Sequence, residues 1–185
     1  MGRFPTLAGA VLLVGALGAC GGSDTGSTGA VDTAEPATEQ PSPDDRAPQF
    51  VNDVFDALDA VETALGAGQA YFEVTANAQF TNVFVAVDDA TAAVAYAFVD
   101  GELQPPAPKQ AGATGNTFTV DDVGYDPALV LSGVRADLPT SEVDAISVYG
   151  DGVGATYVLA ATSEVGGFLD IVVGPEGQVL SVDPI

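Results

Sequence analysis

The residue best suited to covalent chemistry is Cys20, the one cysteine in this chain of 185 residues. A thiolate is a strong nucleophile and a site for covalent modification, and its reactivity depends on its surroundings. Cys20 lies where an uncharged apolar run, residues 4–19, ends and a stretch beginning Gly21-Gly22 starts. A single cysteine excludes a disulfide within the chain. The feature to explain is therefore a lone thiol at the end of an apolar segment.

Carboxylates are the other groups that could do chemistry, because the sequence has 26 Asp and Glu residues and no His. Without His, the usual base for a Ser or Cys nucleophile is missing, and so are most ligand sets for transition metals. Two carboxylates could still act as acid and base in a hydrolase. Asp88-Asp89 and Asp121-Asp122, however, are adjacent in sequence and typical of solvated turns. We expect no catalytic residue, and a carboxylate-based hydrolase is the alternative.

Calcium would suit the oxygen-rich side chains best among metals, but the sequence has no D-x-D-x-D-G loop with its closing Glu. We therefore predict no metal site and no cofactor. Low-affinity cation binding by a salt-adapted acidic surface is a further alternative. The glycine-rich stretch 150–154 lacks the lysine of a phosphate-binding loop and is predicted to be a hairpin turn.

The net charge of −22 limits the partners of this protein. Nucleic acid is excluded, because phosphate binding needs clustered Lys and Arg. Bare anionic lipid would also repel the chain, so contact with a membrane requires a hydrophobic or covalent anchor.

The N-terminal segment has the pattern of a secretory signal. Met1-Gly2-Arg3 is a short basic start, and the apolar run that follows is shorter than the roughly 20 residues of a transmembrane helix. Leu17-Gly18-Ala19-Cys20 resembles the lipobox of bacterial lipoproteins. The resemblance implies cleavage between Ala19 and Cys20, a diacylglycerol thioether on Cys20 and often an acyl chain such as palmitate on its amine. It places the protein on the extracytoplasmic side of the cell membrane; the alternative is a secreted protein with a free cysteine.

Three regions follow from these patterns. Residues 1–19 are a predicted signal peptide, and residues 20–47 are a lipidated cysteine with a linker rich in Gly, Ser, Thr and Pro. The linker has six acids, one base and no large apolar residue apart from valine, so we expect it to be disordered. Residues 48–185 are long enough for a globular domain with its own core.

The globular part is predicted to be α+β, with two helices on one face of an antiparallel sheet. A helix is expected over residues 49–65 from its apolar stripe, and a second from Asp126-Pro127 to Pro139. Strands are expected over 70–77, 80–88 and 91–99, and then over 145–149, 155–162, 167–173 and 178–182. Pro105 to Asn116 is a predicted loop.

Both halves of the domain show one order, a helix followed by strands, which predicts a duplication with repeats at about 48–115 and 116–185. Sliding the sequence by 74 residues aligns Val83–Asp100 with Tyr157–Gly174. The ending LDIVVGPEGQVLSVD resembles PepSY-type modules, and the tandem order is similar to secreted β-lactamase-inhibitor-like proteins. The resemblance implies binding or inhibition in the cell envelope, with no functional residue to carry over.

The strands are apolar on both sides, and helices should cover one side only. In the 91–99 strand, Val94, Tyr96 and Phe98 form one face, and Ala93, Ala95, Ala97 and Val99 form the other. We expect Val94, Tyr96 and Phe98 to be a binding face for a protein partner or an apolar ligand. The alternative is a dimeric or edge-to-edge core. The predicted function is a non-catalytic, envelope-anchored lipoprotein with an acidic binding domain.

Overall fold

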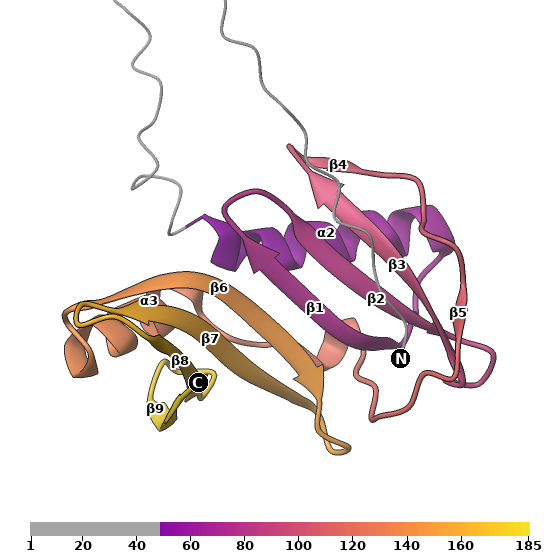
Figure 1. The fold of residues 1–185 in the computed structure, drawn as a ribbon. Helices are drawn as coiled ribbons and strands as arrows, with labels where there is room; N and C mark the ends of the chain where they lie inside the picture. The colour runs from indigo at the N-terminus through magenta and orange to yellow at the C-terminus, as the bar shows by residue number, and fades with distance from the viewer. Residues whose placement is uncertain (1–48) are drawn as a thin grey trace, which may run out of the picture. The chain divides into compact units, whose positions relative to one another are not determined.

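The computed structural model describes residues 49–185, which form an α+β unit built on one nine-stranded antiparallel sheet (Figure 1). Two helices pack against this sheet, so the predicted fold class is confirmed. The predicted signal peptide, the lipidated Cys20 and the linker lie outside the described residues. Within those residues, no helix is long and apolar enough to span a bilayer.

The first helix, α2 (Phe50–Leu65), forms where its apolar stripe predicted it. Its buried side chains are Phe50, Val51, Val54, Ala57, Leu58 and Val61. The helix ends at Gly66, whose φ of 98° favours glycine. Glu62 then holds the departing chain, because its carboxylate accepts hydrogen bonds from the backbone N–H of Gly68 (2.6 Å) and the hydroxyl of Tyr71 (2.6 Å).

Four strands follow α2 as an antiparallel meander: β1 (Tyr71–Asn77), β2 (Thr81–Val87), β3 (Ala92–Val99) and β4 (Glu102–Leu103). The alanine-rich β3 is a strand, as its alternation predicted, although alanine favours helices. Asp88-Asp89 lie in the turn between β2 and β3, as predicted.

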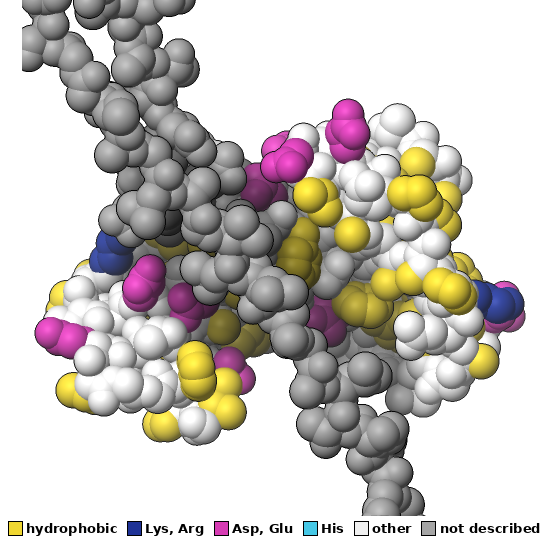
Figure 2. Space-filling view, turned by 45° about the horizontal axis from the view of Figure 1, so that its top comes forward, with side chains coloured by type: hydrophobic (Ala, Val, Ile, Leu, Met, Phe, Trp, Pro, Cys, Tyr) yellow, Lys and Arg dark blue, Asp and Glu magenta, His cyan; other side chains and the backbone are white. Residues whose placement is uncertain are grey.

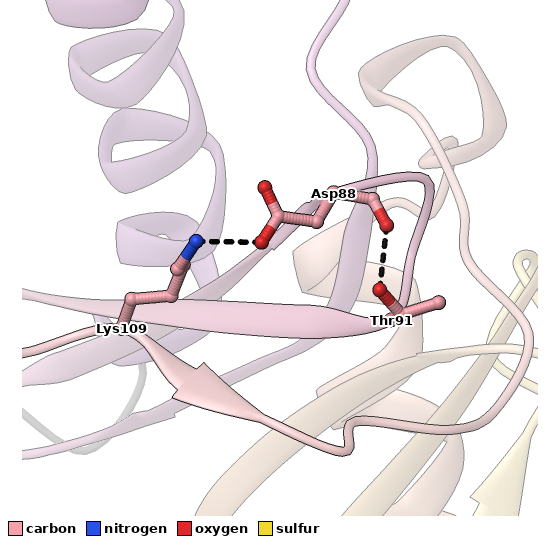
Figure 3. A network of polar contacts seen from close by, with 3 residues as sticks. All are labelled: Asp88, Thr91 and Lys109. Carbon is pink, nitrogen blue, oxygen red and sulfur yellow. Dashed lines mark hydrogen bonds and ion pairs between the residues drawn. The ribbon is translucent and has the colours of Figure 1, made fainter.

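The outer edge of β3 is covered by residues 104–111, and the prediction of a loop from Pro105 to Asn116 was wrong at Gln110 and Ala111. Gln110–Ala111 form the short strand β5 against β3, and the N–H of Ala107 donates to the carbonyl of Ala95 at 2.8 Å. Lys109 forms an ion pair of 2.6 Å with Asp88 (Figure 3). Three prolines in this segment lack N–H donors, so it protects β3 without offering a complete edge to another strand.

The second half begins with a short 3₁₀ helix, η1 (Val120–Asp122), and the helix α3 (Pro127–Asp137). The predicted turn at Asp121-Asp122 is thus one turn of 3₁₀ helix. The predicted start of α3 is confirmed, because the carboxylate of Asp126 caps it by accepting from the N–H groups of Ala128 (2.9 Å) and Leu129 (3.1 Å).

Four strands complete the sheet: β6 (Ser141–Gly150), β7 (Ala155–Ser163), β8 (Phe168–Val173) and β9 (Val179–Pro184). β6 begins four residues before the predicted Ala145. The reason is a β-bulge between Val143 and Ala145, which interrupts the two-residue alternation while pairing with β7 continues.

The two halves meet at the pair β1 and β6, and the strand order is β4-β3-β2-β1-β6-β7-β8-β9. Each half therefore runs outward from the centre of the sheet. At the junction, Val74 pairs with Val148, and the hydroxyls of Thr75 and Ser147 lie 2.7 Å apart. The shared element order agrees with the order that suggested a duplication; the duplication itself stays a prediction.

An aromatic cluster ties the segment between the halves to the core. The ring of Tyr125 lies 4.8 Å from that of Phe55 on α2 and 4.9 Å from that of Tyr157 on β7, centre to centre. Its hydroxyl donates to the carbonyl of Val51 at 2.5 Å. Burial raises the pKa of Tyr125, so the group remains a neutral donor.

Two glycines let α3 approach the turn between β8 and β9. A Cβ at Gly133 would lie 1.8 Å from the carbonyl oxygen of Gly177, and one at Gly177 would lie 2.1 Å from that of Leu129. The N–H of Asp126 also donates to the carbonyl of Pro175 in this turn (3.1 Å). This contact explains a glycine in the middle of α3, where it otherwise costs helix stability.

Candidate functional site

The predicted binding face on β3 lies on the side of the sheet that carries the core. Val94 pairs with Val85, and Tyr96 pairs with Val83, both partners being fully buried. Tyr96 and Phe98 pack against the core. The helix-covered side thus holds Val94, Tyr96 and Phe98; a ligand contact by these residues stays a prediction, and among them Phe98 lines a pocket described below.

The opposite side of the sheet is an open face, on which no helix of residues 49–185 packs. In Figure 1, the strands β1, β2 and β3 lie in front of α2, which is on the far side. Cross-strand partners place the apolar residues of the open face: Phe84, Ala86, Ala93, Ala95, Ala97 and Val99 in the first half and Ala145, Tyr149, Val158, Ala160, Phe168 and Val172 in the second. Most are half-buried, as expected for a sheet surface without a second layer.

The charges on the open face are acidic. They belong to Glu73, Glu102, Glu142, Asp170 and Asp183, and Asp144 in the β6 bulge accepts a hydrogen bond from Thr162 beside them. The described part of the chain has two basic residues, and neither lies on this face: Lys109 pairs with Asp88, and Arg135 is on α3. In Figure 2, the Lys and Arg atoms lie at two opposite margins of the view, and Asp and Glu side chains are spread between them. The open face therefore combines apolar area with uncompensated negative charge.

A pocket of about 240 Å³ lies at the beginning of α2. Three separate elements build it: the first turns of the helix, the turn between β1 and β2, and the turn between β3 and β4. The lining residues are Gln49, Phe50, Asp53, Asp56, Ala78, Gln79, Phe80, Phe98, Asp100 and Gly101. The helix and the two strand turns are thus brought to one end of the sheet by the meander of the first half.

Carboxylates dominate the polar part of this pocket. Asp53 and Asp56 are three residues apart on α2 and so lie on the same side of the helix, and Asp100 comes from the β3–β4 turn. Burial raises the pKa of Asp53, and the neighbouring charge of Asp56 raises it further. Among residues 49–185, no three Asp, Glu or Cys side chains are close enough together to hold a metal ion. The pocket therefore concentrates negative charge without the geometry of a metal site.

Sequence reasoning missed the pocket, although it predicted each element that builds it. The available signal was that Asp53 and Asp56 lie off the apolar stripe of the helix, which is also what a solvated helix face shows. Phe80 and Asp100 lie in turns, and their approach to the start of α2 depends on the path of the sheet.

The predicted hairpin turn at residues 150–154 is confirmed: Asp151 accepts from the N–H groups of Val153 and Gly154, both at 2.8 Å.

Comparisons with known proteins support the fold alone. No family model and no curated protein matches the chain. The structure is similar to a crystal structure described as a "putative lipoprotein" from Clostridium difficile 630, with a TM-score of 0.52 and 13% sequence identity. The match covers 71% of this chain and 91% of that chain. The resemblance to PepSY-type and β-lactamase-inhibitor-like modules stays a prediction, whereas the α+β fold is shared with this "putative lipoprotein".

Proposed function

We propose that this chain is a lipid-anchored protein of the cell envelope whose domain binds a partner protein and performs no catalysis. The resemblance of Leu17–Cys20 to a lipobox supports the anchor, and the fold shared with the protein described as a "putative lipoprotein" is consistent with it. The domain would then stand on the extracytoplasmic side of the membrane, tethered through residues 20–47.

The open face of the sheet carries the proposal of a binding role. An apolar sheet surface of this extent, with no helix over it in the described residues, is the kind of area that proteins use for contact. Its charges are all acidic, and the described residues hold all but six of the 26 acids of the chain. A second copy would bring like charges together, which is unfavourable. The partner is therefore a protein with Lys and Arg around an apolar patch.

The anchor is tested by mass spectrometry of the natural protein. We expect a mature chain that begins at Cys20 and carries lipid on that residue, and loss of membrane retention in Cys20→Ser. A chain that keeps Met1, or an unmodified residue 20, would refute the anchor.

The open face is tested by site-specific photo-crosslinking in the natural host. A benzophenone side chain at Val158 should capture a basic partner, whereas the same group at Leu129 on α3, 47% exposed, should not. The purified partner should then bind the full chain, with at least about tenfold weaker affinity for Ala95→Lys and Val158→Lys. Leu129→Lys is the matched control and should bind as the natural chain does. Equal capture from Leu129, or unchanged affinity of the face variants, would refute this surface.

The hydrolase alternative retains one specific observation in its favour. Asp53, whose pKa is raised by burial, shares a pocket with two further carboxylates, and acid–base hydrolysis uses two carboxyl groups at one site. Hydrolysis of a panel of aryl glycosides that disappears in Asp53→Asn would favour this alternative over a purely binding role.

A further inference from the structure

We propose that the pocket at the start of α2 binds an organic cation, namely an alkylammonium or guanidinium group with apolar atoms beside the charge. This pocket is on the helix side of the sheet and is separate from the open face, so the inference goes beyond the proposed function. The end of a lysine or arginine side chain and a small free amine share this chemistry.

Aromatic rings form the apolar part of the pocket. Phe50 is buried at 1% exposure, Phe98 is half-buried against the core, and Phe80 is 39% exposed in the β1–β2 turn. The rings therefore range from deep to open positions along the pocket. Phe50 closes the floor of the pocket, and an organic cation would gain from contact of its carbon atoms with the more exposed rings of Phe80 and Phe98 and from attraction to their π faces.

The carboxylates of the pocket have no partner among the described residues that would neutralise them. Lys109 forms an ion pair with Asp88, and Arg135 lies in the last turn of α3, a helix that contributes no residue to the pocket. The N-terminus of α2 contributes about half a positive charge. Asp53, Asp56 and Asp100 together outweigh this contribution several-fold, so the pocket favours a cation over an anion. Burial is the main reason that the pKa of Asp53 is raised, and the neighbouring charge of Asp56 adds to it.

The size and layout of the pocket favour a polyatomic cation over a bare metal ion. Its volume of about 240 Å³ is several times the roughly 30 Å³ that one water molecule occupies. Its carboxylates also do not form a group that could share one metal ion. A cation with its charge spread over several atoms can reach carboxylates on two sides while its carbon atoms contact the rings.

The test is a titration of the full chain in a non-ionic detergent at fixed ionic strength, followed by NMR of backbone amides. Choline and methylguanidinium are the cationic probes, and 3,3-dimethylbutan-1-ol is the neutral isostere of choline. We expect saturable shifts at residues 49–56, 78–80 and 98–101 with the cations and none with the alcohol. Binding of the alcohol as tight as that of choline, or shifts that spread over the acidic surface without saturation, would overturn the proposal.

Matched variants separate the pocket from the overall charge of the domain. Asp53→Asn and Asp100→Asn should each weaken binding of the cations at least about tenfold, and Phe80→Ser should weaken choline binding with the charge unchanged. Asp137→Asn, which removes one exposed acid at the end of α3, should bind as the natural chain does. An equal effect of Asp137→Asn and Asp53→Asn would overturn the proposal, provided that the amide spectra show both variants folded.

A further arm identifies the source of the cation. If the peptide Gly-Arg-Gly binds more tightly than methylguanidinium, a protein side chain is the ligand; if the free amines bind at least as tightly, a small molecule is. Either result supports the shared chemistry. Because the crosslinking at Val158 does not involve this pocket, failure of the cation titration would leave the proposed role of the open face standing.

Discussion

The two halves of the domain have the same order of elements but attach their helices to the sheet differently. In the first half, α2 buries six side chains in the core. Glu62, near the end of this helix, also accepts a hydrogen bond from the hydroxyl of Tyr71 on β1. In the second half, α3 buries three side chains and relies on its Asp126 cap and on the backbone contact between Gly133 and Gly177. Buried side chains thus hold α2, whereas α3 combines a smaller buried surface with a close backbone approach that two glycines permit.

This difference predicts that truncating a core side chain of α2 lowers the free energy of unfolding more than truncating one of α3. Leu58→Ala on α2 should lower the free energy of unfolding by about 2–5 kcal/mol, because it removes a fully buried side chain from a dense core. Leu131→Ala on α3 should fall at or below the lower end of that range, since Leu131 is 7% exposed. Urea unfolding followed by circular dichroism measures both. Equal losses would contradict the comparison.

The glycine contact of the second half should be intolerant of a single methyl group. An exposed Gly→Ala change inside a helix usually stabilises by up to about 1 kcal/mol. Gly133→Ala should instead destabilise by about 1–3 kcal/mol, because its Cβ would overlap the carbonyl oxygen of Gly177. Gly154→Ala, with no atom within 4 Å of the added Cβ, is the matched control and should change stability little. A stabilised Gly133→Ala variant would show that the contact does not hold α3.

The residues that precede the two helices should contribute differently to the free energy of unfolding, because only one of them makes side-chain hydrogen bonds to its helix. Asp126→Ala removes the acceptor for two N–H groups of α3 and should cost about 1 kcal/mol. Gln49 makes no side-chain cap at α2, so Gln49→Ala should stay within about 0.5 kcal/mol of the natural chain. The same unfolding assay compares them, and a larger loss in Gln49→Ala would reverse the assignment.

The smallest expected effects concern how the stability of the protein depends on pH. One carboxylate in each half should change this dependence, and the two changes should have opposite signs. Burial raises the pKa of Asp53 above its ordinary 3.8 in the folded protein. At a pH above this raised pKa, the ionised carboxylate lowers the free energy of unfolding. Below pH 3.8 the group is protonated in both the folded and the unfolded chain, and the loss disappears. The pKa of Asp151 is lowered, first by the hydrogen bond from the N–H of Val153, so its contribution is present above 3.8 and is lost as the pH falls through the lowered value.

Asp53→Asn should therefore be more stable than the natural chain at neutral pH and equal to it in acid. Asp151→Asn should be less stable at neutral pH, with a difference that shrinks only below pH 3.8. Thermal unfolding across this pH range measures both differences. The same sign for the two variants would contradict the assigned environments.

Much of the fold could be predicted because the signals are local. The stripe on α2, the Asp126-Pro127 start of α3 and the hairpin turns depend on residues within a few positions of one another. The early start of β6 was missed because a bulge breaks the alternation at Val143. The strand β5 was missed because Gln110 and Ala111 have no strand signal and pair only because β3 has a free edge beside them.

The sequence by itself determined the helices, most strands, the acidic surface and the two faces of β3, because spacing along the chain sets which side chains share a face. Only the tertiary structure decided which face of β3 the core covers, because both faces are apolar. In the structure, the larger side chains of Val94, Tyr96 and Phe98 lie on the side covered by the helices, and the alanines lie on the open face. It also created the pocket, because three segments separated in sequence form a cavity only after the meander brings their ends together.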